Sequence, residues 1–380
     1  MPDAAVPEAA RLAAVDAARG LAIIGVGLCN VTGFAAPLSD AEAAPRLVSA
    51  GERGLWIAEQ VLLQGRLVAL LSLLFGASML WVGGDGGESV RNARLNRRLV
   101  WLAVIGLLHG VLLWWGDILL PYAVAGLIVR GARGWPPRRQ LIAGIVAYAA
   151  GMVLLRIDGA LALLAPHPAI ATVAAHAAGL PDGFWSAQAA LIGQNAHDWV
   201  AAVPQTSLAT LLTSAPLMLI GMALVRLRWL VPAELTRQAG ALLLGGLAAV
   251  LVALPIALMQ AGVWSTGWTP EALTFWAVTL RLITAPFGAL AWLAVAALLP
   301  RLQPVCAALG RLALSAYLGQ SLLARLGFAL APRAFGHIDY GVLMGATSAI
   351  LVGQWGVALL WERKGWRGPA EALWRRLYLT

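Results

Sequence analysis

The sequence is poor in charged residues and in cysteine. Only 12% of its 380 residues are charged, whereas 60% are hydrophobic. Soluble globular chains are about half apolar and a quarter charged, so this composition excludes an ordinary soluble domain. The two cysteines, Cys29 and Cys306, lie within or beside apolar runs. Neither a disulfide framework nor a thiolate metal site is therefore indicated.

Motifs of soluble catalysis are also missing. The sequence contains no P-loop and no metal-ligand motif such as HExxH, and we predict no metal site. The first sixteen residues have no basic region and no cleavage motif ahead of the first apolar run, so we expect no cleaved signal peptide. Any chemistry is then expected inside the apolar part of the chain.

Long apolar runs dominate the sequence. Runs of roughly 18 to 25 residues predict membrane-spanning helices, because lipid requires every backbone polar group to bond within its own segment. We therefore expect an all-α integral membrane protein, a single transmembrane domain over 1–380 with about ten spans. The expected spans are 18–36, 59–82, 98–115, 117–130, 140–160, 207–226, 237–260, 272–299, 305–330 and 340–361.

Two segments depart from this pattern. The stretch 161–206 holds four prolines and an amphipathic piece near 184–203, and we expect an extracytoplasmic loop with a surface helix. An eleventh span there stays open. The basic and aromatic tail, 362–380, is expected to be a cytoplasmic interfacial helix attracted to anionic lipid.

Arginines gather in short clusters between alternate apolar runs. The positive-inside rule places these clusters in the cytoplasm, which requires an even number of spans with both termini inside. The same clustering argues against nucleic-acid binding, although the formal net charge is +9. Larger clusters are Arg91, Arg94, Arg97 and Arg98, then Arg130, Arg133, Arg138 and Arg139.

A histidine lies inside one apolar run. Ionisable groups are costly in hydrocarbon, so His109 is a candidate functional residue. Arg98 precedes it by eleven residues, the same interval that separates Arg19 from Asn30. Each interval climbs roughly 16 Å along a helix, about half the hydrocarbon thickness. We expect Asn30 and His109 at a similar depth, and the sequence leaves open whether their helices are neighbours.

Asp117 follows the histidine-bearing run. A continuous helix would separate it from His109 by about 12 Å, unless Gly116 ends the helix and Asp117 folds back. Structural roles stay open as well: a helix N-cap for Asp117, a topology signal for Arg98, and an interhelical hydrogen bond for His109 or Asn30.

Three further polar residues, Arg66, Arg281 and Gln320, lie within apolar runs near the same level. Arg281 is too deep to reach water easily and has no acidic residue in its own helix. A buried arginine requires a carboxylate, a phosphate or carbonyl groups as partners. We predict that these three residues contact an acceptor or a lipid headgroup.

Several sequence blocks follow one another along the chain: RLAAVDAARGLAIIGVGLCN, LLQGRLVALLSLLFGASM, RRLVWLAVIGLLHGVLLWWGDILLPYAVAGLI, ALGRLALSAYLGQSLL and PAEALWRRLY. In this order they resemble the YeiB-like family of bacterial inner-membrane proteins. That family is distantly similar to a transmembrane acyltransferase superfamily, which includes bacterial O-acyltransferases and the lysosomal heparan-alpha-glucosaminide N-acetyltransferase. In the O-acyltransferases an Arg-x10-His element on the first span is linked to acyl transfer.

The present chain has that spacing twice. The first span carries Arg19 and Asn30, and the third carries Arg98 and His109. The resemblance implies a bacterial inner-membrane acyltransferase that uses an acyl-CoA, with acetyl-CoA as the first candidate. The acceptor is expected to be an extracytoplasmic or lipid-linked hydroxyl or amine, on a glycan or a lipid.

We assign roles accordingly. Arg19 and Arg98, assisted by Arg94 or Arg97, are expected to bind the phosphates of the donor. His109 is expected to act as general base or as acyl carrier. Asn30 would donate to the oxyanion and Asp117 would orient or charge the acceptor.

Two other functions stay open. A transporter, or a lipid- or solute-binding bundle, would use the same buried polar residues without chemistry. A sensor or structural protein without turnover is the other alternative hypothesis. Membrane lipid is an expected partner, and homodimer formation stays open.

Overall fold

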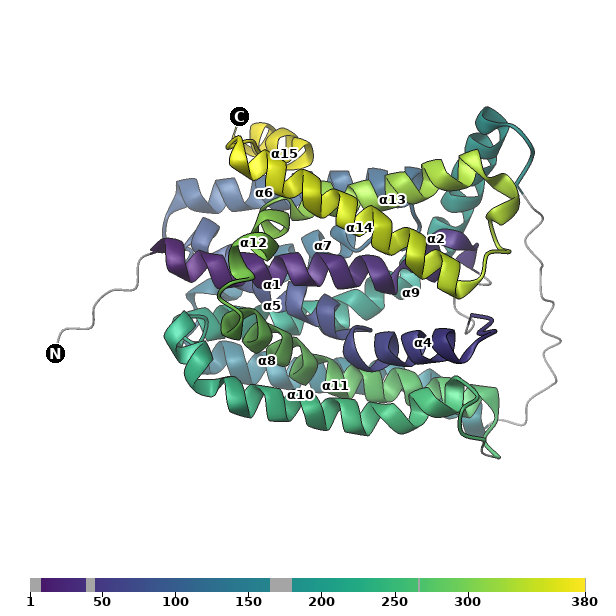
Figure 1. Ribbon diagram of the computed structural model, residues 1–380. Helices are drawn as coiled ribbons and strands as arrows, with labels where there is room; N and C mark the ends of the chain where they lie inside the picture. The colour runs from purple at the N-terminus through teal and green to yellow at the C-terminus, as the bar shows by residue number, and fades with distance from the viewer. Residues whose placement is uncertain (1–7, 39–44, 165–179, 266, 380) are drawn as a thin grey trace.

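The protein is a bundle of α-helices. The computed structural model describes residues 8–38, 45–164, 180–265 and 267–379, and contains no strand within them. Its long helices lie roughly along one direction, and α15 lies at the same end as the first turns of α1 (Figure 1). The elements are α1 (Glu8–Cys29), α2 (Val31–Ala35), α4 (Ala50–Leu62), α5 (Arg66–Gly83), α6 (Ser89–Leu112), α7 (Leu119–Val129), η1 (Arg130–Gly134), α8 (Pro137–Leu164), α9 (Phe184–Arg226), α10 (Pro232–Gln260), α11 (Pro270–Leu298), α12 (Gln303–Arg311), α13 (Ala313–Leu330), η2 (Pro332–Ala334), α14 (Tyr340–Arg363) and α15 (Pro369–Leu379).

Seven helical stretches of the described chain are long and apolar enough to cross a membrane. Each overlaps one of the spans expected from the sequence. The remaining expected spans, 18–36, 117–130 and 305–330, lie on α1 with α2, on α7, and on α12 with α13. The seven stretches are Ala50–Gly83, Ser89–Leu112, Pro137–Leu161, Phe184–Arg226, Pro232–Gln260, Pro270–Leu298 and Tyr340–Arg363.

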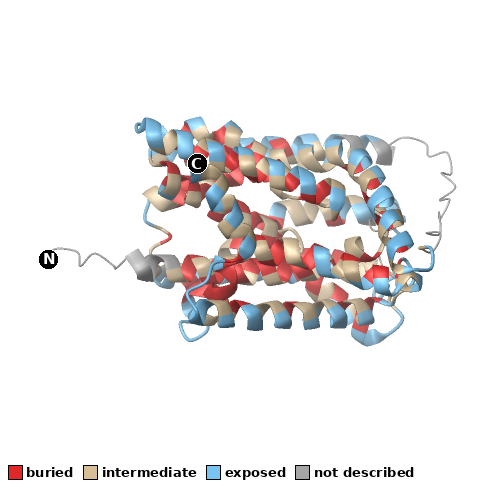
Figure 2. Ribbon diagram, turned by 90° about the horizontal axis from the view of Figure 1, so that it is seen from above, coloured by how far each residue is buried: buried red, intermediate tan, exposed pale blue. Residues whose placement is uncertain are grey.

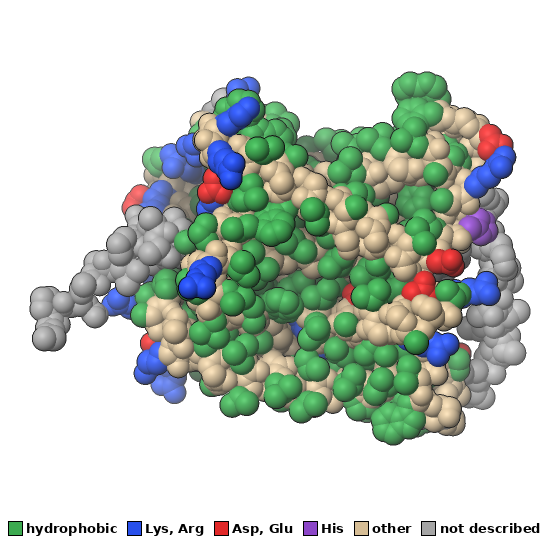
Figure 3. Space-filling view, viewed as in Figure 1, with side chains coloured by type: hydrophobic (Ala, Val, Ile, Leu, Met, Phe, Trp, Pro, Cys, Tyr) green, Lys and Arg blue, Asp and Glu red, His purple; other side chains and the backbone are tan. Residues whose placement is uncertain are grey.

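The outer faces of the bundle are apolar. On α10, Leu244, Leu247 and Leu251 are exposed by more than half. Buried residues concentrate in the interior of the bundle, where helices face one another (Figure 2). Hydrophobic side chains cover the middle of the face seen in Figure 3, and charged side chains gather toward its two ends. Such a surface requires lipid around it, so the expected class, an all-α integral membrane protein, is confirmed.

The segment 161–206 differs from the sequence expectation. The helix α8 continues to Leu164, and Phe184–Arg226 forms one helix of 43 residues. The amphipathic piece near 184–203 is therefore the N-terminal half of α9 and not a separate surface helix. Pro204 does not end the helix, because tertiary packing overrides its local preference. The part of the expected loop at 165–179 lies outside the described residues.

Close helix crossings hold the bundle together. At the crossing of α1 with α12, a Cβ on Gly20 would lie 2.0 Å from the carbonyl oxygen of Cys306. At the crossing of α5 with α9, a Cβ on Gly221 would lie 1.9 Å from the carbonyl oxygen of Leu73. Lipid supplies little hydrophobic drive between helices, so association depends on such close backbone packing.

One end of the bundle collects cationic side chains. Arg133 of η1 is buried there and donates to the carbonyl oxygens of Gly83 and Arg130. Its burial lowers the pKa of Arg133, and the neighbouring Arg130 lowers that pKa further. At the same end, Glu371 of α15 accepts from the amides of Leu314 and Ser315 and so caps α13. This contact fixes the C-terminal helix against the bundle.

Candidate functional site

The centre of the site is His109 on α6, of which 2% is exposed. Its Nδ1 lies 2.9 Å from Oδ1 of Asp117. Its Nε2 lies 2.9 Å from the hydroxyl oxygen of Ser321 on α13. All three side chains are buried. Since Asp117 as a carboxylate only accepts, it fixes the proton of a neutral imidazole on Nδ1 and leaves Nε2 to accept from the serine.

Asp117 reaches the histidine because the chain turns back. The helix α6 ends at Leu112, and α7 begins at Leu119. Oδ2 of Asp117 accepts a hydrogen bond of 2.8 Å from the amide of Leu120. The chain therefore folds back, and Asp117 contacts His109 instead of lying about 12 Å away as it would on a straight helix. Asp117 binds the imidazole with one oxygen and caps the first turn of α7 with the other.

Glycine at position 106 permits this turn. A Cβ on Gly106 would lie 2.2 Å from the amide nitrogen of Leu120 and 2.9 Å from Oδ2 of Asp117. Real Cβ atoms do not approach backbone so closely. Gly106 lies three residues before His109, close to it on the helix, so its missing side chain is what allows Asp117 to reach the imidazole.

Two other helices fix the end of α6. Arg325 of α13 donates to the carbonyl oxygen of Leu112 at 2.6 Å and also to Gln188 of α9. Asn195 of α9 donates to the carbonyl oxygens of Gly110 and Val111 at 2.8 Å. The terminal carbonyls of a helix lack partners within it, so these donors stabilise the end of α6. They hold His109 against Ser321, one turn before Arg325.

We expect the substitution Arg325→Met to lower the free energy of unfolding by about 2 to 3 kcal/mol. The charged donor is lost, and buried carbonyl groups on α6 and α9 are left without a partner. Thermal melting of the purified protein measures the effect. Arg333→Met is the matched control, because Arg333 is exposed and should leave the melting temperature unchanged. Equal melting of both variants would refute the role given to Arg325.

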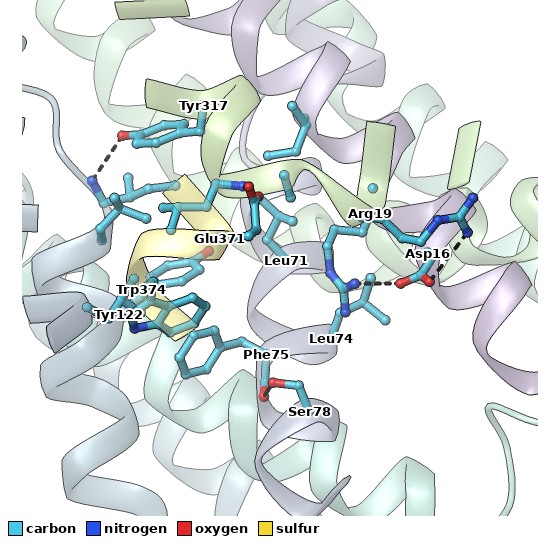
Figure 4. Close-up of a pocket in the computed structure, with 18 of the residues that line it drawn as sticks. Asp16, Arg19, Leu71, Leu74, Phe75, Ser78, Tyr122, Tyr317, Glu371 and Trp374 are labelled. Atoms are coloured by element: carbon cyan, nitrogen blue, oxygen red, sulfur yellow. Dashed lines mark hydrogen bonds and ion pairs between the residues drawn. The ribbon is translucent and has the colours of Figure 1, made fainter. Parts of the chain in front are cut away.

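A first cavity opens toward the end of the bundle that carries α15. We call it the basic cavity, since Arg19, Arg98 and Arg311 line it. Its volume is about 360 Å³, within the range of ~300–1,000 Å³ typical of small-molecule sites. Figure 4 shows Arg19 and Asp16 to one side of the cavity, and Leu71, Leu74 and Phe75 form an apolar wall of it. An ion pair of 2.6 Å joins Arg19 to Asp16.

Arg98 is differently placed. Its guanidinium lies over the ring of Trp374, 4.5 Å from the centroid, and the indole of Trp374 donates to the carbonyl oxygen of Arg98. Within the described part of the chain, this guanidinium makes no hydrogen bond or ion pair. The helix α15 therefore positions a cation in the basic cavity without neutralising it.

A second, smaller cavity lies on the other side of His109. We call it the aromatic pocket; its volume is about 40 Å³, and one water needs roughly 10–15 Å³. Ser321 lines it, and so does Trp115, whose indole Nε1 is buried without a partner among the described residues. The other lining side chains of interest are Phe34, Trp114, Gln194, Asn195, Asp198, Arg325, Phe328 and Phe335.

The two cavities are separated at Tyr317. Tyr317 and Ile118 line the basic cavity, and the phenol oxygen accepts from the amide of Ile118 at 3.3 Å, which is a long hydrogen bond. The ring of Tyr317 lies 5.0 Å from the ring of His109. His109 lines neither cavity. The imidazole is thus enclosed between a cationic cavity and an aromatic one.

The arginines expected to bind phosphate fall into two groups. Arg19 and Arg98 both line the basic cavity, on α1 and α6. Arg94 and Arg97 are exposed and line no cavity described above. Helical rotation explains the difference, since neighbouring positions point about 100° apart. The equal spacing in the sequence therefore located two of the four arginines at one cavity.

Asn30 is not brought to the histidine. It lies between α1 and α2, half-buried, and its side chain makes no hydrogen bond to the described residues. The contact from this region comes one turn later, where the indole of Trp114 donates to the carbonyl oxygen of Gly33 at 2.9 Å. Whether Asn30 lies beside His109 was left open by the sequence, and the described contacts include none between them.

The three other candidates connect helices instead of lining either cavity. Arg66 donates to the carbonyl oxygens of Gln60 and Gln64 and to the hydroxyl of Thr284, which closes the break between α4 and α5. Arg281 donates to the side chain of Gln60 at 3.1 Å. Gln320 donates to a carbonyl oxygen of α1 at 3.2 Å. Each arginine therefore has at least one acceptor inside the bundle, but Nε of Arg66 is buried without a partner among the described residues, and Arg281 lines a separate cavity of about 200 Å³.

Ser321, Tyr317 and Arg325 were not among the residues predicted for the site. These positions differ by four, so they form a polar stripe along one face of α13. The stripe was a detectable signal within the block ALSAYLGQSLLARL. No group of three or more His, Cys, Asp or Glu side chains suited to a metal occurs among the residues that the structure describes.

Together these features define a polytopic helical membrane protein with a buried carboxylate–imidazole–hydroxyl chain between two cavities. A family model described as "Protein of unknown function (DUF418)" matches residues 224–380. The chain is 28% identical over 385 residues to "Uncharacterized protein YeiB" of Escherichia coli K12, covering 96% of this chain and 95% of that protein. The family match and this relative support the resemblance to the YeiB-like family that the sequence blocks indicated.

A second relative matches over a shorter length. "Uncharacterized protein YxaH" of Bacillus subtilis 168 is 30% identical over 146 residues, 36% of each chain. No solved structure matches this chain. The DUF418 match includes Ser321 but begins after His109 and Asp117, so the site draws on residues inside and outside the matched region.

Proposed function

We propose that this protein is a membrane-embedded acyltransferase. It would move an acyl group from a cytosolic acyl-CoA to a hydroxyl or amine on the opposite side of the membrane. Acetyl is the first candidate for this group. The observation that carries the proposal is His109, held by Asp117 and facing the hydroxyl of Ser321, between a basic cavity and an aromatic pocket.

The basic cavity suits the donor. Guanidinium groups bind phosphate through paired N–H donors, and Arg98 offers a cation without an anionic partner in the described chain. The apolar wall formed by Leu71, Leu74 and Phe75 suits an uncharged arm leading inward. The phosphates would bind at Arg19 and Arg98, and the thioester would enter toward Tyr317.

The imidazole suits general-base catalysis. Asp117 keeps the proton of neutral His109 on Nδ1 and stabilises the imidazolium that forms when Nε2 takes a proton. The amide of Ile118, the residue before α7, donates to the Tyr317 hydroxyl and would take the place of Asn30 as the oxyanion donor. Displacement of the Tyr317 hydroxyl by the thioester would free that amide.

The aromatic pocket suits the acceptor. Its aromatic walls carry a few polar groups, among them Asp198 and the unpartnered indole N–H of Trp115. A glycan or lipid-linked hydroxyl or amine has both an apolar face and a polar edge. The pocket is small, so its walls would move apart to admit more than the reacting group.

For the topology we propose about ten crossings, both termini in the cytoplasm, and the bacterial inner membrane. Support comes from Arg98 and Arg311, which line the basic cavity together with residues of α1 and α15. On this orientation the basic cavity opens to the cytoplasm, where acyl-CoA is found. Lipid would surround the bundle, and this topology is compatible with a homodimer.

Binding and release experiments test the proposed function. Purified protein in lipid nanodiscs is mixed with labelled acetyl-CoA, and bound ligand and released CoA thiol are measured. We expect binding, with release that is lost in His109→Gln while binding remains. Absence of acyl-CoA binding to correctly folded protein would overturn the proposal.

The arginines provide a matched comparison. Arg19→Gln and Arg98→Gln should each weaken acetyl-CoA binding about tenfold to a hundredfold, because a charge-assisted hydrogen bond contributes about 1.5–3 kcal/mol. Arg94→Gln and Arg97→Gln remove the same charge from exposed positions of α6 and should change the affinity less than about twofold. Calorimetric titration measures all four. Equal effects would show that net charge, and not the cavity, attracts the ligand.

A transporter is the second function that the geometry favours. Two cavities on either side of a closed layer at Tyr317 are also the arrangement required for alternating access. A transporter would move its solute without breaking the thioester. Intact acetyl-CoA recovered after prolonged binding, from wild type and from His109→Gln alike, would favour this function over acyl transfer.

A further inference from the structure

The hydroxyl of Ser321 is bonded differently from those of several other serines in the described helices. Ser72, Ser78 and Ser348 each donate to a carbonyl oxygen three or four residues earlier in their own helix. This is the usual way for a helical serine to satisfy its hydroxyl. Ser321 has no such bond among the described contacts, and its oxygen lies 2.9 Å from Nε2 of His109. Its hydroxyl is directed at a base.

The three groups form an ordered chain. Oδ1 of Asp117 lies 2.9 Å from Nδ1 of His109, and Nε2 lies 2.9 Å from the oxygen of Ser321. A carboxylate, an imidazole and a hydroxyl linked in this order activate serine as a nucleophile on unrelated folds, and the arrangement is recognised by geometry and not by sequence order. The residues are supplied here by two helices and the turn after α6.

The position of Ser321 indicates in which direction an acyl group would move. Ser321 lines the aromatic pocket, whereas Tyr317, one helical turn earlier, lines the basic cavity. A thioester that displaces the phenol from Ile118 would therefore meet the serine next. A group that leaves the serine would face the aromatic pocket. Only the acyl group has to pass the closed layer, which matches the small volume of that pocket.

We propose that Ser321 carries the acyl group between the two cavities, an inference that rests on the proposed acyltransferase function. In the first step the oxygen of Ser321 bonds to the thioester carbon, and its proton moves to Nε2 of His109. The carbon–sulfur bond then breaks, and His109 returns the proton to the thiolate. The products are a serine ester and free CoA thiol.

The second step transfers the group onward. An acceptor hydroxyl or amine in the aromatic pocket loses its proton to Nε2 of His109 and bonds to the ester carbon. The bond to the serine oxygen breaks, and the proton returns from His109 to Ser321. The two steps together transfer one acyl group from the thioester to the acceptor, and they require no oxidant or further reactant. The amide of Ile118 donates to the oxyanion in the first step.

Isotope exchange tests this inference without a known acceptor. Full-length protein in nanodiscs is mixed with acetyl-CoA and labelled CoA, and label entering acetyl-CoA is followed. A serine ester formed reversibly predicts exchange in the wild type. Peptide mass spectrometry after acid quenching should place an acetyl group on Ser321.

Variants separate the outcomes. Ser321→Ala should bind acetyl-CoA normally and exchange at least about 1,000-fold more slowly, as expected when a nucleophile is removed. Ser321→Cys should instead form a thioester on the new thiol. Ser348→Ala, which removes a helical hydroxyl from α14, is the control and should exchange like the wild type.

Two results overturn the inference. Wild-type protein that binds acetyl-CoA and releases CoA thiol, yet shows neither exchange nor an acetylated serine, transfers the group directly; the proposed function then stands and the carrier does not. Exchange that persists in Ser321→Ala also excludes the carrier. Failure of the wild type to bind acetyl-CoA overturns the proposed function itself, and the carrier with it.

Discussion

Replacing Asp117 with asparagine should reduce acyl transfer by about 10³- to 10⁴-fold while leaving the bundle folded. The amide of Leu120 requires an oxygen acceptor, so the asparagine oxygen should stay where Oδ2 of Asp117 now lies. The NH₂ group would then face Nδ1 of His109 and donate to it. The imidazole would carry its proton on Nε2 and could no longer accept from Ser321.

The measurement is the initial rate of CoA release or isotope exchange, with melting temperature as the check on folding. His109→Ala should lose at least as much rate, and the double variant should lose little more, because the two residues act as one unit. Glu52→Gln is the matched control: Glu52 is a buried carboxylate that accepts from backbone amides and lines neither cavity. An Asp117→Asn variant with wild-type rates would refute the orienting role.

The second large effect is expected from Gly106→Ala. A single methyl group at this position would overlap the amide nitrogen of Leu120, and backbone cannot rotate away as a side chain can. Overpacking typically costs about 1–3 kcal/mol, and a clash with backbone should reach the upper end. The turn that holds Asp117 would move away from α6, so transfer should fall together with stability.

Thermal melting and the rate of CoA release, measured on the same preparation, check both parts. Gly345→Ala is the matched control, since Gly345 is an exposed helical position with no atom near its missing Cβ. It should be neutral or stabilising by up to about 1 kcal/mol. Gly106→Ala with unchanged melting and unchanged turnover would show that the close approach of the turn is not required.

Local sequence determined the class of fold. The low charge and the length of the apolar runs were sufficient for an all-helical membrane protein, because hydrocarbon leaves the backbone no other way to satisfy its polar groups. The same local rule failed at Pro204, which lies inside α9, whereas Pro166 and Pro168 lie outside the described residues. Packing of α9 against α5 and α8 keeps Pro204 and Pro216 inside one helix.

The identity of the key histidine also came from the sequence. An ionisable side chain in an apolar run is informative without any structure, and His109 is buried at the centre of the site. Equal spacing predicted a common depth for Arg19 and Arg98, and both line the basic cavity. Spacing measures depth along a helix and says nothing of lateral neighbours, which is why the sequence could not decide whether Asn30 contacts His109.

Tertiary structure decided everything that depends on helix rotation and on chain reversal. In a membrane both the lipid-facing and the buried faces are apolar, so hydrophobic periodicity does not reveal which arginine of α6 faces the cavity. Ser321 is 212 residues from His109 along the chain, and only helix packing brings them together. Asp117 depends on a missing methyl group at Gly106. The sequence supplied the imidazole, and packing supplied its carboxylate and its hydroxyl.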